Sequence, residues 1–565
     1  MTVLGISCYY HDSSAAILRD GVVVAAAQEE RFDRDRYSPA FPIQAINFCL
    51  QQAGITIYDI DEVAFYEKMY LKFQRTIISH LNGFPHTFRN FAETMPLWLK
   101  DRLAVSFAIE DELSFKKPVR YVKHHLSHAS SAFLVSPFER AAILTVDGVG
   151  EYACATWGTG NGSQINIRQE LHYPHSVGLL YSIVTAFLGF RVFTGEGKVM
   201  ALAEYGEPEY MDQFRTLVDL KPDGSFRLDT RYFSFNRGDT MHNAAFVELF
   251  GPARMPGEPL TDRHHAIAAS LQRMTEDIVL AMARNIHKQT GEKHLCMAGG
   301  VSLNVTANSR IRQEGPFDDI FIQPAAGDAG AALGAAAYVH HVVQGKPRSH
   351  PMRTCALGPE HKNHMVEVLL RNSRANYRKL DRAELVQEAA RRIAANQVVG
   401  WYQGRAEFGP RALGNRSILA NPANPEMKDH INAVVKHRES FRPFGASVLA
   451  ERVGEFFDFE GESPFMLLVA NVREDKRGTI PAVTHVNHTS RIQTVTAEDN
   501  GIFYELIVAF AELTGIPMVL NTSFNKDEPI VNTPAEALAC FEHSQMDCLV
   551  INDFLVERTA PEGSP

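Results

Sequence analysis

The residues between positions 404 and 417 combine arginine and glycine in a spacing suited to binding anions. Arg405, Arg411 and Arg416 each follow a glycine by one or two residues. A guanidinium group can bind phosphate or carboxylate through two parallel hydrogen bonds. Glycine lets backbone N–H groups approach an anion closely. The segment therefore predicts a pocket for small phosphorylated anions rather than a solvated loop.

Two histidines and two aspartates are candidate metal ligands. His124 and His128 are four residues apart, so on a helix both imidazoles would share one face. The segment is not a zinc-protease motif, because His125 stands where that motif needs glutamate. Asp147 ends an apolar strand and Asp328 begins a small-residue helix, so each could add a carboxylate. Histidines bonded in a core, an ordinary Asp-Gly turn and a helix cap are the alternative interpretations.

Glycine-containing segments add candidate phosphate contacts. The segment 195–198 lacks the spacing and the Ser or Thr of a Walker A loop, which excludes a P-loop. Another follows a strand and would allow a nucleotide close to the backbone. The candidate residues of these two segments are Gly195, Gly197, Lys198, Gly299, Gly300 and Asn304. A third segment, residues 5–14, resembles the first phosphate loop of the actin, sugar-kinase and heat-shock ATPase fold.

Alternating strand and helix patterns surround these residues. Strands are predicted over residues 3–9, 15–18, 21–27, 63–66, 141–146, 294–297 and 320–322, and helices over 42–53, 264–289, 330–343 and 382–394. This alternation predicts an α/β fold with helices covering the sheets. Residues 345–359 are poor in apolar side chains and predict a linker between a domain over residues 1–350 and one over 363–565.

Composition excludes several classes of protein. A chain of 565 residues is too long for one core, and a net charge of -10 argues against a general nucleic-acid binder. The seven scattered cysteines form no C-x-x-C pair, which predicts buried thiols in a reducing cytosol. The N-terminus is not expected to be a signal peptide, and the apolar run over residues 329–343 is too short to span a bilayer. We therefore expect a cytoplasmic protein without a membrane partner.

The motifs together resemble the carbamoyltransferases of the nodulation and antibiotic-tailoring family. The resemblance rests on the metal-ligand and glycine candidates in the N-terminal part and on residues 404–417, 436–444 and 520–525 in the C-terminal part. In that family the N-terminal domain is similar to the tRNA threonylcarbamoyl-transfer protein, a member of the actin-like ATPase (ASKHA) superfamily. The C-terminal α/β domain is similar to threonylcarbamoyl-adenylate synthase.

The resemblance implies a two-step O-carbamoyl transfer. The C-terminal domain would convert carbamoyl phosphate and ATP, bound with Mg²⁺, to carbamoyl-adenylate and pyrophosphate. The N-terminal domain would hold the adenylate on its glycine segments. It would then pass the carbamoyl group to a hydroxyl of a small-molecule acceptor, a natural product or sugar, at a divalent metal resembling Fe(II). The implied C-terminal ligands are Arg405, Arg411, Arg416, Lys436, Arg438, Arg491, Asn521, Ser523 and Asn525.

Several alternatives stay open at this level. The general base is assigned to His11 or Asp12, although His11 could simply shape its turn. A kinase-like ATPase, or a non-catalytic regulator of a tRNA-modifying assembly, would also explain the glycine segments. The sequence leaves open the acceptor, the identity of the metal and a homo-oligomeric state. The aromatic residues that could line an acceptor mouth or belong to a core are Phe73, Phe84, Phe88 and Phe91.

Overall fold

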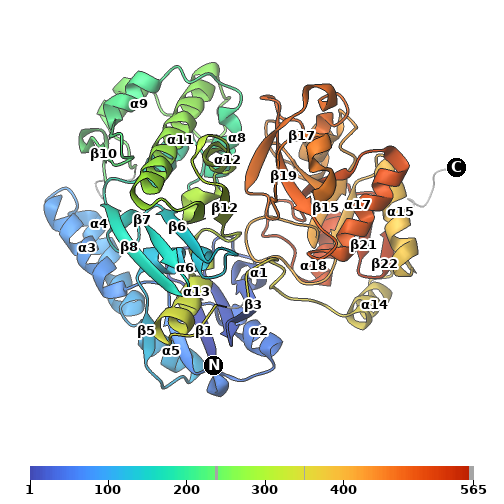
Figure 1. Ribbon diagram of the computed structural model, residues 1–565, viewed down its shortest axis with the longest axis horizontal. Helices are drawn as coiled ribbons and strands as arrows, with labels where there is room; N and C mark the ends of the chain where they lie inside the picture. The colour runs from blue at the N-terminus through green and yellow to red at the C-terminus, as the bar shows by residue number, and fades with distance from the viewer. Residues whose placement is uncertain (236–239, 349, 559–565) are drawn as a thin grey trace. The chain divides into compact units, whose positions relative to one another are not determined.

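The chain folds into two compact units, seen in a computed structural model that describes residues 1–235, 240–348 and 350–558 (Figure 1). Unit 1 consists of Met1–Glu29 and Tyr37–Met352, and unit 2 consists of Glu30–Arg36 and the chain from Arg353 onward. The change of unit after Met352 falls within the segment 345–359 that was expected to be a linker. That a short early segment belongs to unit 2 has no counterpart in the sequence patterns.

Unit 1 contains two five-stranded sheets with the same strand order and the same pairing sense. In each, three strands form an antiparallel meander, the first of them pairs in parallel with a fourth strand, and the fourth pairs in parallel with a fifth. The first sheet contains β3 (Val22–Gln28), β2 (Ser14–Arg19), β1 (Thr2–Ser7), β4 (Glu62–Phe65) and β5 (Val119–Tyr121) in spatial order. The second contains β12 (Asp319–Ile322), β11 (His294–Ala298), β6 (Arg140–Val146), β7 (Ala153–Asn161) and β8 (Gln164–His172).

This duplicated arrangement confirms the predicted α/β class and the actin-like architecture of the N-terminal part. All seven predicted strands correspond to observed strands, because short, nearly continuous apolar runs mark them clearly. The predicted helices 42–53 and 264–289 are α2 (Ile43–Ala53) and α11 (Asp262–Thr290). The helix expected over residues 330–343 is α13 (Asp328–Ala337), continued by a π-helical turn over Tyr338–Val343.

Helices α6 (His124–Phe133) and α13 pack directly against each other. The small residues of α13 allow this close approach. A Cβ atom added at Gly334 would lie 1.9 Å from the carbonyl oxygen of Ser127 on α6. On β1, a Cβ added at Gly5 would lie 1.9 Å from the carbonyl oxygen of Ala332. The first turns of two neighbouring helices are thereby held near the ends of the central strands.

Further helices of unit 1 cover these sheets or extend from them. They are α3 (Met69–Asn82), α4 (Phe88–Leu97), α5 (Val105–Leu113), α7 (Val177–Phe187), α8 (Glu196–Ala203), α9 (Met211–Leu217), α10 (Ala244–Phe250) and α12 (Val305–Glu314). A small hairpin joins β9 (Val218–Leu220) and β10 (Phe226–Leu228). In the part of the chain that the structure describes, no helix is both long and apolar enough to cross a membrane.

Unit 2 is built on one ten-stranded sheet. Its spatial order is β13 (Asn376–Lys379), β22 (Phe554–Glu557), β21 (Cys548–Ile551), β14 (Val399–Tyr402), β15 (Arg416–Ala420), β20 (Met518–Ser523), β16 (Gly445–Leu449), β19 (Thr489–Val495), β18 (Leu468–Val472) and β17 (Phe457–Asp458). The covering helices are α14 (Asn363–Asn372), α15 (Arg382–Ala394), α17 (Gly501–Thr514) and α18 (Pro534–His543). Helix α15 matches the predicted helix 382–394.

The early segment of unit 2 contains the short helix α1 (Glu30–Asp33) and two anchoring arginines. Arg31 is buried and donates a hydrogen bond to the carbonyl oxygen of Gly409 at 2.7 Å. Arg34 donates to the carbonyl oxygens of Pro529 and Ile530 at 2.6 and 3.0 Å. These bonds attach residues from the beginning of the chain to loops of the C-terminal sheet.

Candidate functional site

The four predicted metal ligands converge in unit 1. His124 and His128 lie one turn apart on α6, Asp147 follows β6, and Asp328 begins α13. One candidate ligand atom from each residue can be chosen so that all four lie within 4.8 Å of one another. Nε2 of His124 lies 2.9 Å from Oδ2 of Asp147 and 3.1 Å from Nε2 of His128, which is 3.6 Å from Oδ1 of Asp328.

The chemistry of this cluster fits a divalent metal. All four residues are buried. Neither carboxylate oxygen of Asp328 has a hydrogen-bond partner among the residues that the structure describes. A buried carboxylate without a hydrogen bond is costly, and a cation bound to its oxygens would offset that cost. Two imidazoles with two carboxylates suit iron as well as zinc.

Charges within the cluster shift the pKa values of its members strongly. Burial by itself lowers the pKa of His124, but Asp328 and Asp147 raise it well above its ordinary value. Burial by itself raises the pKa of Asp147, but His124 and His128 lower it well below its ordinary value. In this structure, therefore, positive charge on the imidazoles compensates the two carboxylates. A bound cation would supply the same compensation.

Neighbouring backbone groups hold the ligands in place. A carboxylate oxygen of Glu151 accepts a hydrogen bond from the backbone N–H of His124 at 3.0 Å. Oδ1 of Asp147 accepts one from the N–H of Gly300 at 2.9 Å. Gly299 has a φ of +92°, and a Cβ there would lie 2.3 Å from the carbonyl oxygen of Val146. The structure thus places the predicted Gly299–Gly300 pair beside a candidate metal ligand.

The other predicted nucleotide contacts lie at helix starts. Gly195 precedes α8, and Gly197 and Lys198 are in its first turn. A helix N-terminus directs free N–H groups outward and favours anions. The side chain of Asn304 caps α12 through the N–H of Ala307 and also donates to Gln272 at 2.9 Å. Its side chain is thus already part of the fold.

His11 and Asp12 occupy the turn between β1 and β2. Nδ1 of His11 lies 2.9 Å from Oδ2 of Asp12, and its Nε2 lies 4.0 Å from Oδ2 of Asp328. The imidazole packs against the rings of Tyr10 and Phe193, with centroid separations of 4.7 and 4.6 Å, and those two rings also contact each other. Burial lowers the pKa of His11, but Asp328 and Asp12 outweigh it and raise the pKa to about 9. The structure therefore brings both predicted base candidates to the edge of the metal cluster.

The C-terminal motifs meet at the centre of the unit 2 sheet. The arginine segment leads into β15, which pairs with β20, where Ser417 faces Ser523 and Leu419 faces Asn521. Strand β16 follows the Lys436 segment and pairs with β20 on one side and β19 on the other. Segments far apart in the sequence thereby lie on four neighbouring strands.

Two of the predicted anion-binding arginines donate mainly to the protein itself. Arg416 is fully buried, stacks on Tyr402 with its guanidinium carbon 3.6 Å from the ring centroid, and donates to four backbone carbonyls. Those carbonyls belong to Gln403, Asn415, Pro359 and Gly404, at 2.8 to 3.1 Å. Arg405 donates to the carbonyls of Leu357 and Gly358. These contacts shape the loop and leave Arg416 few donors for an anion.

Lys436 also makes contacts within the fold. Its ammonium lies 2.5 Å from the carbonyl oxygen of Ser523 and 2.6 Å from Oδ1 of Asn525. Burial and the neighbouring Arg438 lower the pKa of Lys436. Nε of Arg438 donates to Asn432 at 2.7 Å, and its guanidinium lies over Phe444. Nδ2 of Asn521 donates to Ser447 at 2.9 Å. Arg411 and Arg491 are half-buried.

Comparison with known proteins identifies the chain. Residues 2–337 match the family model described as carbamoyltransferase N-terminus, and residues 390–558 match the one described as carbamoyltransferase C-terminus. The chain belongs to the carbamoyltransferase family. The resemblance inferred from the motifs is confirmed, and this carbamoyltransferase is an enzyme.

Relatives extend over most of the carbamoyltransferase. Nodulation protein NolNO of Sinorhizobium fredii is 39% identical, over 97% of this chain and 79% of its own. Nodulation protein U of Rhizobium tropici is 29% identical, over 93% of this chain and 91% of its own. Component A of Acidaminococcus fermentans (R)-2-hydroxyglutaryl-CoA dehydratase aligns with 60% of this chain and 97% of its own, at 15% identity and a TM-score of 0.34.

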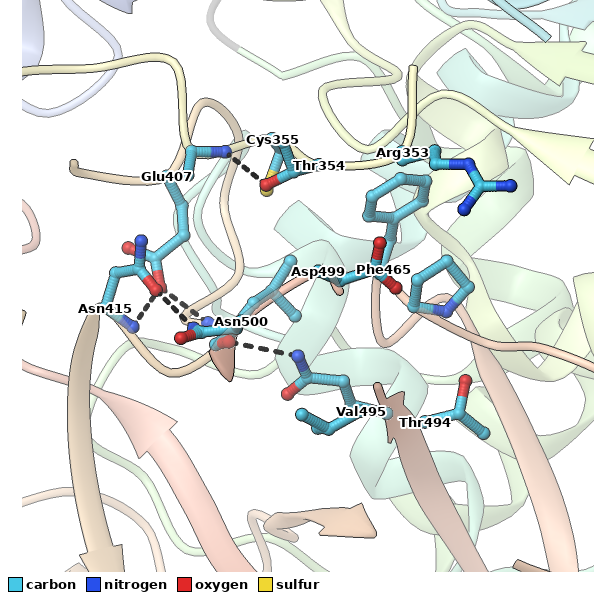
Figure 2. A pocket seen from close by; sticks show the side chains of 14 residues that line it. Arg353, Thr354, Cys355, Glu407, Asn415, Phe465, Thr494, Val495, Asp499 and Asn500 are labelled. Carbon is cyan, nitrogen blue, oxygen red and sulfur yellow. Dashed lines mark hydrogen bonds between the residues drawn. The ribbon is translucent and has the colours of Figure 1, made fainter. Parts of the chain in front are cut away.

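Glu407 of this carbamoyltransferase was not among the residues predicted from the sequence. Glu407 lies inside the arginine segment, and its Oε1 accepts the N–H groups of Leu413, Asn415 and Arg416 at 2.7 to 3.3 Å. It lines a pocket in unit 2 with Asn415 and Asn500, whose side chains are bonded at 2.7 Å (Figure 2). The available sequence signal for Glu407 was that it is the single acidic residue in a segment with three arginines.

The aromatic residues between positions 73 and 91, which could line an acceptor mouth or belong to a core, are only partly packed in the structure. Phe84 and Phe88 are 67% and 61% exposed, so the core interpretation is wrong for these two. Phe73 packs near Trp98 at a centroid separation of 5.4 Å, and Phe91 lies near His80. The segment thus divides into a packed part and an exposed part.

Proposed function

We propose that this carbamoyltransferase transfers a carbamoyl group to a hydroxyl of a small-molecule acceptor in two ATP-dependent steps. The observation that carries the proposal is the buried cluster of His124, His128, Asp147 and Asp328 with His11 at its edge. A simple ATPase would have no use for such a cluster. The separate convergence of the C-terminal motifs on four strands supports a second site that prepares the donor.

The first step belongs to unit 2. Carbamoyl phosphate gives up its phosphoryl group to water, and the resulting carbamate oxygen displaces pyrophosphate from the α-phosphorus of ATP, bound with Mg²⁺. The products are carbamoyl-adenylate, pyrophosphate and orthophosphate. Arg411, Arg438 and Arg491 would bind the phosphates, because fixed cations stabilise the charge that develops on them. Arg405, Arg416 and Lys436 would hold the loops that present these groups.

The second step belongs to unit 1. Backbone N–H groups at Gly195, Gly197 and Gly299–Gly300, together with Lys198, would hold the adenylate, and Asn304 would support them by capping α12. The acceptor hydroxyl would lose its proton to the His11–Asp12 pair once a cation at the cluster offsets the charge of Asp328, which raises the pKa of His11. Transfer within one chain would protect the reactive adenylate from water.

The residues His124, His128, Asp147 and Asp328 would hold a divalent metal, for which Fe(II) is the candidate implied by the family. Such an ion supplies Lewis-acid polarisation of a phosphoryl or carbonyl oxygen. The side chain of Asp328 also faces the turn that bears His11, with its Oδ2 4.0 Å from Nε2 of His11. We propose a cytoplasmic reaction between small molecules, with no nucleic acid as partner, in line with the net charge of -10.

Product analysis tests the first step. The purified full chain is incubated with ATP and carbamoyl phosphate, without acceptor. We expect pyrophosphate and orthophosphate in equal amounts, both dependent on carbamoyl phosphate. Formation of ADP would contradict the proposal and favour a kinase-like ATPase. Failure to release pyrophosphate even with a panel of sugar and aminoglycoside alcohols would also contradict it.

The His11→Ala variant tests the second step. Removing the imidazole leaves unit 2 unchanged, so pyrophosphate formation should stay within twofold of the wild type. Transfer from preformed carbamoyl-adenylate to an alcohol should fall by roughly 10²–10⁴-fold, the usual contribution of a general base. Full transfer activity in this variant would show that His11 only shapes its turn.

A further inference from the structure

A buried ion pair lies behind one of the two metal-ligand histidines. Oε2 of Glu67 and Nζ of Lys72 are 2.7 Å apart, and their side chains are 1% and 6% exposed. Removing two charges from water costs several kcal/mol per ion, so a buried pair is weak support for stability by itself. The location of this pair therefore calls for a functional explanation.

The backbone around Glu67 is fixed by the same contacts that fix α6. The carbonyl oxygen of Tyr66 accepts a hydrogen bond from Oγ of Ser127 at 2.8 Å. The N–H of Lys68 donates at 2.8 Å to Oε1 of Glu151, and that oxygen also accepts the backbone N–H of His124 at 3.0 Å. The residues on either side of Glu67 are thus attached to the helix that carries both ligand histidines.

The two nitrogens of the His124 ring face different partners. Nε2 faces Oδ2 of Asp147 at 2.9 Å, inside the cluster. Nδ1 lies 3.7 Å from Oε2 of Glu67, a distance typical of an ion pair and longer than a hydrogen bond. The ring has little room to turn, because a Cβ added at Gly150 would lie 2.8 Å from it. A carboxylate on the Nδ1 side favours the tautomer whose Nε2 lone pair can bind a metal.

Glu67 is also paired with a cation. Its carboxylate lies 2.7 Å from Nζ of Lys72. Lys72 lies over the ring of Tyr10, 4.5 Å from the centroid, so the pair also borders the turn that bears His11. Nδ1 of neither His124 nor His128 has a hydrogen-bond partner among the described residues, but Nδ1 of His124 has the Glu67 carboxylate within ion-pair distance.

We propose that Glu67 is a positioning residue that holds His124 in the metal-binding orientation and tautomer. The inference rests on the metal site of the proposed function. It assigns a purpose to a buried carboxylate that is not one of the four candidate metal ligands. Since outer partners of ligand histidines typically contribute 10–100-fold to metal affinity, the effect should be measurable without any turnover.

Metal titration of the full-length protein tests the assignment. Metal-free wild type, Glu67→Gln, Glu67→Leu and the control Glu62→Gln are titrated with Co²⁺, followed by its visible absorption. Glu62 lies on the neighbouring strand β4 and pairs with the half-exposed Arg120, away from the cluster. Thermal unfolding of the metal-free proteins checks that each variant is folded. We expect Glu67→Gln and Glu67→Leu to bind Co²⁺ about 10–100-fold more weakly, with the control unchanged.

The outcomes separate the positioning role from the proposed function. Near-normal binding in Glu67→Gln, with or without weaker binding in Glu67→Leu, would show that the charge of Glu67 does not hold His124. Wild-type affinity in both variants would overturn the role of Glu67 and leave the metal site standing. A wild type that binds no Co²⁺, Zn²⁺ or Fe²⁺ would overturn both. If Glu67→Leu fails to fold, the comparison of Glu67→Gln with the wild type still decides, because glutamine has the shape of glutamate.

Discussion

At the scale of single residues, buried arginine is used in two ways in unit 2. Arg416 donates to four backbone carbonyls and is fully enclosed, whereas Arg411, five residues earlier, is half-buried. Only arginine has a planar fork that can serve several carbonyls at once. Two residues of the same type in one motif can therefore have different tasks.

Substitution by lysine should separate these tasks. Arg416→Lys would leave several buried carbonyls without donors, so we expect the free energy of unfolding to fall by about 2–4 kcal/mol. Arg411→Lys should change stability by less than about 0.5 kcal/mol and lower the rate of pyrophosphate formation instead. Urea denaturation and product analysis measure the two effects. Equal stability losses in both variants would contradict the distinction.

His361 makes the stability of unit 2 dependent on pH. Burial and the nearby Arg416 lower its pKa from 6.5 to about 4, and its Nδ1 lies 2.8 Å from the hydroxyl of Tyr402. Between pH 6.5 and 4 the unfolded chain therefore binds a proton that the folded chain does not, so stability falls as the pH falls through this window.

His361→Gln should remove this contribution. We expect the variant to lose less stability between pH 7 and pH 4.5 than the wild type, measured by urea denaturation at each pH. The exposed His543 provides the control, because His543→Gln should follow the wild-type curve. Identical curves for wild type and His361→Gln would show that other groups dominate acid destabilisation.

At the scale of elements, the spacing between α6 and α13 sets the geometry of the metal cluster. Each helix supplies ligands, and Gly334 lets their backbones approach. A Cβ there would meet the carbonyl of Ser127 at 1.9 Å, so α13 would have to move away from α6.

Gly334→Ala should therefore impair both stability and metal binding. We expect a loss of about 1–3 kcal/mol, as for overpacked cores, and weaker Co²⁺ binding because Asp328 moves with α13. Gly454→Ala is the control, since a Cβ at that position meets nothing within 4 Å. Wild-type cobalt affinity in Gly334→Ala would mean that the cluster tolerates the shift.

The sequence could predict these elements better than their arrangement. Strands such as β1 and β6 are apolar runs with clear boundaries, and Asp147 and Asp328 stand where a strand ends and a helix begins. Which strands pair within each of the two sheets depends on contacts between segments that are distant in the sequence. The periodicity of apolar residues carries no information about these contacts. Glu67 was missed for the same reason: it lies in an irregular stretch, and only the fold brings it to His124.

At the scale of the whole molecule, unit 2 requires residues from near the start of the chain. A protein beginning at Arg353 would lack Arg31 and Arg34 and leave the carbonyls of Gly409, Pro529 and Ile530 without these donors. We expect such a protein to unfold at a lower urea concentration than unit 2 in the full chain, followed by a tryptophan signal, since Trp401 is buried in its core.

A synthetic peptide covering residues 28–38 gives the complementary measurement. Added to the shortened protein, it should restore part of the lost stability, because it supplies both arginines. A peptide in which both arginines are replaced by glutamine should have no effect. Equal effects of the two peptides would attribute the stabilisation to something other than the arginine bonds.

The placement of Glu30–Arg36 has a consequence for biosynthesis. A ribosome makes these residues more than 300 residues before the loops that they contact. They leave the ribosome with unit 1, and their final partners emerge only after unit 1 has been made. The loops of unit 2 thus fold against a segment that already exists. A chimera of two relatives joined at the linker would combine residues 30–36 of one protein with unit 2 of the other. A functional chimera must therefore take residues 30–36 and unit 2 from the same protein.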